Sequence, residues 1–179
     1  MLKQQHKKER TSRMSKIITV IYGSSTGNTE HAAQAIAGKL GGRAVNIRNA
    51  SAADFQADLL ILGTSTWGCG ELQDDWMNGV ALLETADLSG KLVAFFGLGD
   101  AVGFGDTYLN GMGELAEKAV ARGAKIVGRW PSEGYMHSLS TAEEGGFFAG
   151  LALDDDNEPG ETADRIDRWC EQLRREAAL

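Results

Sequence analysis

The feature that most constrains this chain is a regular alternation of short, continuous apolar runs with segments whose apolar residues recur at helical spacing. Continuous apolar runs are typical of strands covered on both faces, and helical spacing predicts amphipathic helices between them. We expect strands at residues 17–22, 44–47, 59–63, 92–97, from 125–127 onward and at 147–153, and helices at 28–40, 73–84, 107–122 and 162–178. The alternation predicts an α/β fold with an open parallel sheet and helices on both faces.

The loops after residues 22, 63 and 97 are the candidate site, because ligands of such sheets bind beyond the carboxyl ends of the strands. The first loop combines four hydroxyl side chains and two glycines with a helix N-terminus, where backbone N–H groups and the helix dipole favour an anion. It has neither the lysine of a nucleotide P-loop nor the GxGxxG pattern of dinucleotide folds. A monophosphate held by neutral donors fits this pattern, and a Ser/Thr-rich helix cap is the alternative. The candidate residues are Ser24, Ser25, Thr26, Gly27, Asn28 and Thr29.

A tryptophan marks the loop after the expected strand at 59–63. Trp67 comes shortly after a buried strand in a glycine-rich loop, which suits a stacking platform at the edge of a ligand, and a core tryptophan is the alternative. The candidates here are Ser65, Thr66, Trp67, Gly68, Cys69 and Gly70, of which Cys69 is interpreted as small filler beside the ring. The third loop adds Leu98, Gly99, Asp100 and Phe104, with Tyr108 as a rival aromatic that fits the following helix better.

The three loops resemble those of flavodoxins. Residues 17–30 resemble the phosphate loop T/S-x-T-G-x-T, residues 65–76 the tryptophan loop of long-chain members with its ending GELQ-x-DW, and residues 97–108 the loop G-x-G-D-x-x-x-Y. An insertion near residues 128–146 and the segment F-x-GLALD-x-DN also resemble the long-chain subfamily. Two departures stand out: Ser65 replaces the usual proline, and Phe104 stands where most members carry a stacking tyrosine.

The resemblance implies a single-domain, open five-stranded parallel sheet of order 2-1-3-4-5, with the long insertion in its fifth strand. It also implies a non-enzymatic, low-potential carrier that holds FMN without a covalent bond and shuttles single electrons through the semiquinone/hydroquinone couple. Trp67 and Phe104 would then cover the two faces of the flavin, and the backbone near Asp100 would hold its pyrimidine edge. The Gly68 carbonyl would accept the N5–H of the reduced ring after its peptide turns over.

Two other classes of protein share this topology. An NAD(P)H-dependent FMN or quinone reductase needs an open flavin face, which aromatic residues on both sides would block. A phosphoacceptor signalling domain needs an aspartate at the end of the third strand, where this chain has Thr64, and a lysine at the end of the last, which is not evident. The acidic run at 154–156 lacks the glycine and distal glutamate of a calcium loop, so we expect a solvated turn there.

The net charge of −7 is distributed unevenly. Residues 1–13 are basic, and without them 13 basic and 24 acidic side chains remain; residues 49–117 contain 11 acidic side chains and Lys91 as the only basic one. Such a surface repels nucleic acid and anionic membranes and attracts basic patches on proteins. We therefore expect basic-patched redox partners, a reductase donor and an electron acceptor, and the resemblance leaves nitrogenase, pyruvate oxidoreductase and NADP reductase systems open.

The remaining features concern the location and the ends of the chain. No apolar run approaches the roughly 20 residues of a membrane span, and residues 1–13 have no apolar core of a secretory signal. Two cysteines make neither a disulfide scaffold nor a metal cluster. We expect a cytoplasmic monomer without a metal, with a disordered basic extension at 1–15 and a flavodoxin-like domain at 16–179. A basic arm that binds a partner is the alternative for the extension.

Overall fold

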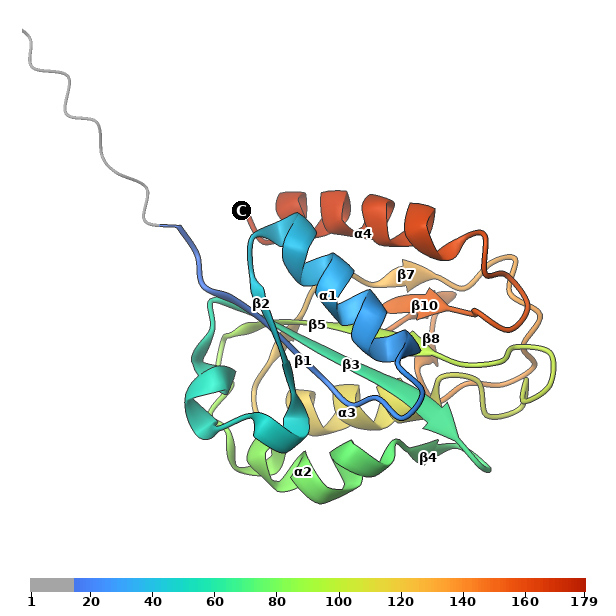
Figure 1. Cartoon of the computed structure of the whole chain (residues 1–179), viewed down its shortest axis with the longest axis horizontal. Helices are drawn as coiled ribbons and strands as arrows, with labels where there is room; N and C mark the ends of the chain where they lie inside the picture. The colour runs from blue at the N-terminus through green and yellow to red at the C-terminus, as the bar shows by residue number, and fades with distance from the viewer. Residues whose placement is uncertain (1–14) are drawn as a thin grey trace, which may run out of the picture.

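Three apolar runs form the centre of a parallel sheet in the computed structural model, which describes residues 15–179 (Figure 1). They are β1 (Ile18–Tyr22), β3 (Leu59–Trp67) and β5 (Leu92–Leu98), and almost every residue in them is buried. β2 (Arg43–Asn46) pairs with β1 at one edge, while β6 (Lys125–Ile126) and β10 (Leu151–Leu153) both pair with β5 at the other. The strand order β2-β1-β3-β5, followed by β6 and β10 as two parts of a fifth strand, confirms the expected order 2-1-3-4-5.

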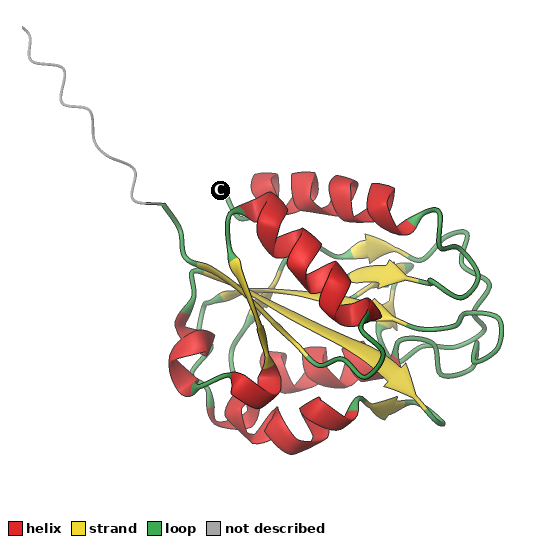
Figure 2. Ribbon diagram, viewed as in Figure 1, coloured by secondary structure: helices red, strands yellow, loops and turns green. Residues whose placement is uncertain are grey.

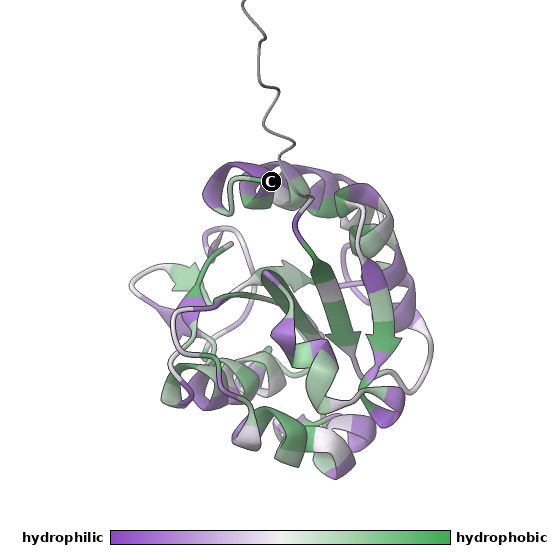
Figure 3. Ribbon diagram, turned by 90° about the vertical axis from the view of Figure 1, so that its left-hand side faces the viewer, coloured by the Kyte–Doolittle hydropathy of each residue, from purple (hydrophilic) through white to green (hydrophobic). Residues whose placement is uncertain are grey.

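Helices cover both faces of the sheet, as Figure 2 shows. α1 (Asn28–Leu40) and α4 (Thr162–Glu176) lie together on one face, and α2 (Asp74–Thr85) and α3 (Asn110–Ala121) on the other. Two short 3-10 turns, η1 (Ile47–Asn49) and η2 (Ala52–Gln56), connect β2 to β3. Hydrophobic residues concentrate on the strands and on the helix sides that face them (Figure 3), so the core is sandwiched between the sheet and its two helical layers.

The insertion lies between β6 and β10 and builds a second, small antiparallel sheet. Its strands are β7 (Trp130–Pro131), β8 (Glu143–Glu144) and β9 (Phe147–Phe148), in the order β7-β9-β8. The expectation of one strand at 147–153 was therefore wrong, because β9 belongs to the small sheet and β10 to the large one. The change of sheet occurs at Gly150, where a Cβ atom would lie 1.9 Å from the Phe95 carbonyl oxygen.

Two further boundaries differ from the sequence-based prediction. β3 runs four residues farther than expected, to Trp67, because its end forms a hairpin with β4 (Glu71–Leu72). α3 begins at Asn110 and not at 107, since Leu109 adopts a left-handed conformation with φ 57°. Tyr108 consequently precedes the helix.

The carboxyl ends of β1, β3, β5 and β10 meet at one edge of the sheet, where Ser65 and Leu153 both pair with Leu98. Within the described residues, no helix is both long and apolar enough to cross a membrane. The extension expected at 1–15 falls, apart from its last residue, outside the described residues. That expectation stays a prediction.

Candidate functional site

A cavity of about 490 Å³ opens where the carboxyl ends of β1, β3 and β5 meet, and all three loops singled out in the sequence contribute to its wall. Among the described residues, the wall takes many hydroxyl and aromatic side chains but no lysine, arginine or histidine. It is lined by Thr26, Asn28, Thr29, Ser65, Thr66, Trp67, Gly68, Leu98, Gly99, Asp100, Phe104, Thr107, Tyr108, Leu109, Asp155 and Asp156.

The first loop delivers the N-terminus of α1 to one end of this cavity. Gly27 occupies the N-cap position, and no side chain among the described residues caps the helix, so the backbone N–H groups of its first turn remain available. Inside the loop, the Gly27 N–H donates to Ser24 Oγ at 3.1 Å. Thr26, Asn28 and Thr29 line the cavity, whereas Ser24, Ser25 and Gly27 shape the loop behind them. An uncapped N-terminus flanked by hydroxyl groups is suited to binding an anion.

The second loop is the tip of the β3–β4 hairpin. The Gly70 N–H donates to the Trp67 carbonyl oxygen at 3.0 Å, which closes a four-residue turn. Gly68 has φ 52° and Gly70 has φ 104°, a left-handed region that favours glycine at both positions of the turn. The turn leaves Trp67 projecting at the cavity with 44% of its surface exposed. Cys69 and Gly70 belong to the turn but do not line the cavity.

The indole of Trp67 is held in place by a residue of its own strand. Its Nε1–H donates to Ser65 Oγ at 2.7 Å. Ser65 is the position at which this sequence departs from the usual proline, and a proline could not accept this hydrogen bond. The other three tryptophans of the chain are buried, so Trp67 alone among them offers a free ring surface.

The third loop holds Phe104 on the cavity wall with 57% of its surface exposed. The loop is fixed by Asp100, whose Oδ1 accepts from the backbone N–H groups of Val102 and Gly103 and from the Asn157 amide. Hydrogen bonds from Gly103 and then from Asn157 hold the pKa of the Asp100 carboxyl below its usual range. Oδ1 is therefore engaged in fixing the loop, while Asp100 also lines the cavity.

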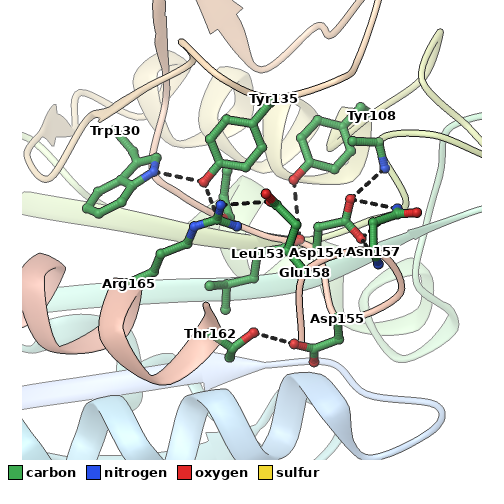
Figure 4. A network of polar contacts seen from close by, with 12 residues as sticks. Tyr108, Trp130, Tyr135, Leu153, Asp154, Asp155, Asn157, Glu158, Thr162 and Arg165 are labelled. Atoms are coloured by element: carbon green, nitrogen blue, oxygen red, sulfur yellow. Dashed lines mark hydrogen bonds and ion pairs between the residues drawn. The ribbon is translucent and has the colours of Figure 1, made fainter. Parts of the chain in front are cut away.

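Tyr108 lies deeper in the same wall than Phe104. Its ring is 1% exposed and packs against His137 and Phe148 of the insertion, and its hydroxyl donates to the Leu153 carbonyl oxygen at 3.3 Å (Figure 4). Burial raises the pKa of the Tyr108 phenol. Tyr108 is thus a structural link between the cavity and the insertion, whereas Phe104 is the aromatic ring of this loop with an open face.

Sequence reasoning missed the acidic part of the wall. Asp155 and Asp156 line the cavity because they follow β10, whose carboxyl end lies beside that of β5. The expectation of a solvated turn is correct for the exposed Asp156 but wrong for Asp154, which is 1% exposed. The Asp154 carboxylate accepts from the Ala101 N–H at 3.0 Å and from Asn157 (Figure 4). The rule that sites follow the carboxyl ends of strands would have found them, because the expected strand at 147–153 ends at the same residue as β10.

The acidic side chains give the cavity mouth a negative potential. Desolvation, and then repulsion from the carboxylates of Asp100, Asp154 and Asp155, raises the pKa of Asp156. None of these four aspartates forms an ion pair with a cation among residues 15–179. The cavity therefore combines an anion-binding helix terminus at one end, two exposed aromatic rings, and an acidic rim. A flat aromatic ligand with a phosphate tail fits this arrangement.

Comparisons with known proteins agree with this geometry. The family model described as flavodoxin matches residues 20–169. The flavodoxin of Picosynechococcus is 47% identical over 166 residues, covering 90% of this chain and 97% of the relative, and flavodoxin 2 of Salmonella typhi is 42% identical, covering 89% and 95%. Among solved structures, Fusobacterium nucleatum flavodoxin bound to flavin mononucleotide superposes with a TM-score of 0.85 at 33% identity, covering 90% of this chain and 98% of that one.

Proposed function

The chain belongs to the flavodoxin family, and from this premise we propose that it holds one FMN without a covalent bond and carries single electrons between redox proteins. The observation that carries the proposal is the cavity itself. It joins an uncapped helix N-terminus to two exposed aromatic side chains within one space of about 490 Å³.

The phosphate of FMN would lie at the start of α1. The proposed contacts come from the loop residues Ser24, Ser25, Thr26, Gly27, Asn28 and Thr29. Backbone N–H groups at a helix N-terminus and short hydroxyl groups bind a phosphate without a cationic side chain. No cationic side chain neutralises a phosphate held in this way, so its negative charge would add to that of the acidic rim.

The ring of FMN would lie between Trp67 and Phe104, beside the backbone of Leu98, Gly99 and Asp100. Of the residues around the hairpin turn, Ser65, Thr66 and Gly68 line the cavity and would face the ring edge, while Cys69 and Gly70 complete the turn that positions Trp67. When bound, the flavin supplies reversible one-electron chemistry. The chain contributes stacking surfaces, exclusion of water from the ring faces, and a carbonyl at Gly68 that can accept a ring N–H.

The acidic wall supports a low reduction potential for the flavin and a preference for basic partner proteins. Asp100, Asp155 and Asp156 lie near the ring end of the cavity, where negative charge disfavours adding an electron. The same charges attract basic patches on other proteins. Two exposed apolar residues belong to the same region: Val102 lies on the Phe104 loop, and Leu139 lies on the insertion. The Leu139 N–H donates to the Gly105 carbonyl oxygen at 3.0 Å, which brings the insertion next to that loop. We therefore propose redox partners with a basic contact surface.

An electron carrier is favoured over an enzyme by the two aromatic rings. A nicotinamide must stack directly on a flavin to pass a hydride, and Trp67 and Phe104 flank the cavity where it would have to enter. Titrating the purified protein with FMN should give one flavin per chain with its fluorescence quenched, and adding NADH or NADPH should leave the flavin oxidised. Failure to bind FMN would contradict the proposed electron-carrier function. Steady oxidation of NADPH would support a reductase instead.

A further inference from the structure

Gln73 connects two parts of the site that the sequence keeps far apart. It is 1% exposed and stands between β4 and α2. Its Oε1 accepts from the Asp75 N–H at 2.9 Å and the Trp76 N–H at 3.4 Å, which caps α2. Its Nε2 donates to Ser25 Oγ at 3.0 Å, in the loop that follows β1. One buried amide therefore holds the start of α2 and the loop before α1 together.

The orientation of this amide is fixed by its surroundings. A flipped amide would place its NH2 group against the two N–H donors of α2, leaving them without an acceptor. The amide also lies directly against the loop after β1, because a Cβ atom added at Gly23 would lie 2.2 Å from Gln73 Oε1 and 2.7 Å from Trp76 Cδ1. Gln73 consequently presents a donor, and never an acceptor, to Ser25.

We propose that Gln73 is a positioning residue for the phosphate end of the site, acting through Ser25. The proposal rests on the proposed binding of FMN. The loop between β1 and α1 carries few internal restraints, of which the Gly27 N–H to Ser24 Oγ bond is one. The bond from Gln73 ties the exposed middle of that loop to the buried amide that caps α2. It holds the loop in the shape in which the first-turn N–H groups of α1 and the hydroxyls of Thr26 and Thr29 face one ligand.

A positioning role predicts an effect that depends on the phosphate. FMN and riboflavin share the ring and the ribityl chain, but riboflavin lacks the phosphate. Loss of the Gln73–Ser25 bond should weaken FMN about five- to tenfold, the fold-change expected for one buried hydrogen bond, and leave riboflavin nearly unchanged. A general loosening of the fold would weaken both ligands alike.

The test measures the ratio of the two dissociation constants for the full chain and its variants. Gln73→Met removes the donor, and Ser25→Ala removes the acceptor at an exposed position with little risk to folding. The preference for FMN should fall in each single variant. Adding Gln73→Met to Ser25→Ala should lower the preference no further, because the acceptor of the Gln73 amide is already missing. Leu82→Ala, on α2 but away from the loop, is the control that destabilises the helix and should keep the wild-type preference.

The outcomes separate this inference from the proposed function. An unchanged FMN preference in either single variant, or additive losses in the double variant, would overturn the role of Gln73. If Gln73→Met does not fold, Gln73→Glu takes its place, because a carboxylate keeps the acceptor that caps α2 and removes the donor to Ser25. A wild-type protein that binds neither flavin would refute the FMN-binding function itself.

Discussion

Replacing Trp67 by alanine should weaken FMN binding by about 1–3 kcal/mol, the range for stacking of an aromatic side chain on a base. The structure places the indole with 44% of its surface open to the cavity and fixes it through the 2.7 Å bond to Ser65. Little rotamer freedom is then lost when a ring stacks on it, which favours the upper part of the range. At 1.4 kcal/mol per factor of ten, the dissociation constant should rise roughly 5- to 150-fold.

Flavin fluorescence is the assay of choice, because a stacked indole quenches the flavin. Trp76, Trp130 and Trp169 are buried elsewhere in the core, so residual quenching in Trp67→Ala would come from Phe104 or from the solvent. Trp67→Phe is the matched control and should retain most of the affinity, since a phenyl ring still stacks. Unchanged affinity and unchanged quenching in Trp67→Ala would show that this residue is not the platform for the ring.

Three further predictions follow from the same loops. Ser65→Ala should raise the FMN dissociation constant about two- to fivefold, because the indole loses one exposed hydrogen bond. Ser65→Thr keeps a hydroxyl and should have the wild-type dissociation constant when FMN is titrated. Gly68→Val should lower the reduction potential of the first one-electron step by tens of millivolts. The left-handed φ of Gly68 costs a branched residue about 1–2 kcal/mol, and 1.4 kcal/mol equals about 59 mV for one electron. Identical potentials in the two proteins would exclude a role for this peptide. The pKa of Asp100 is lowered in the folded protein, so its stabilising contribution is complete above the ordinary aspartate pKa of about 3.9 and is lost as the pH falls through the lower folded value. Asp100→Asn should therefore flatten the acid limb of the melting-temperature profile, and an unaltered limb would contradict this.

Much of the fold was predictable because local signals and sheet burial agree. The helix at 28–40 was predicted with the bounds observed for α1, since its apolar residues recur at helical spacing and Gly41 and Gly42 follow it. The central strands were recognised from runs that are apolar on both faces. The three loops followed from the rule that parallel sheets bind ligands at the carboxyl ends of their strands.

One error arose where the chain passes from one sheet to the other with no change in the composition of its residues. The run at 147–153 is apolar throughout, so its pattern does not record that Gly150 carries the chain from the small sheet to the large one. Asp155 and Asp156 were missed for a different reason: a run of aspartates is typical of a solvated turn, and the loop after residue 153 was not included among the candidate loops. The Gln73–Ser25 bond spans 48 residues and depends on the packing of a buried amide, which no local pattern encodes.

One-electron transfer by this protein is best tested by an anaerobic redox titration of the FMN-loaded form. We expect two separate one-electron steps, with a long-wavelength absorbance that rises during the first step and disappears during the second. The second step should lie at the lower potential, since the rim formed by Asp100, Asp155 and Asp156 opposes the added negative charge. A single two-electron step without the long-wavelength absorbance would contradict a one-electron carrier.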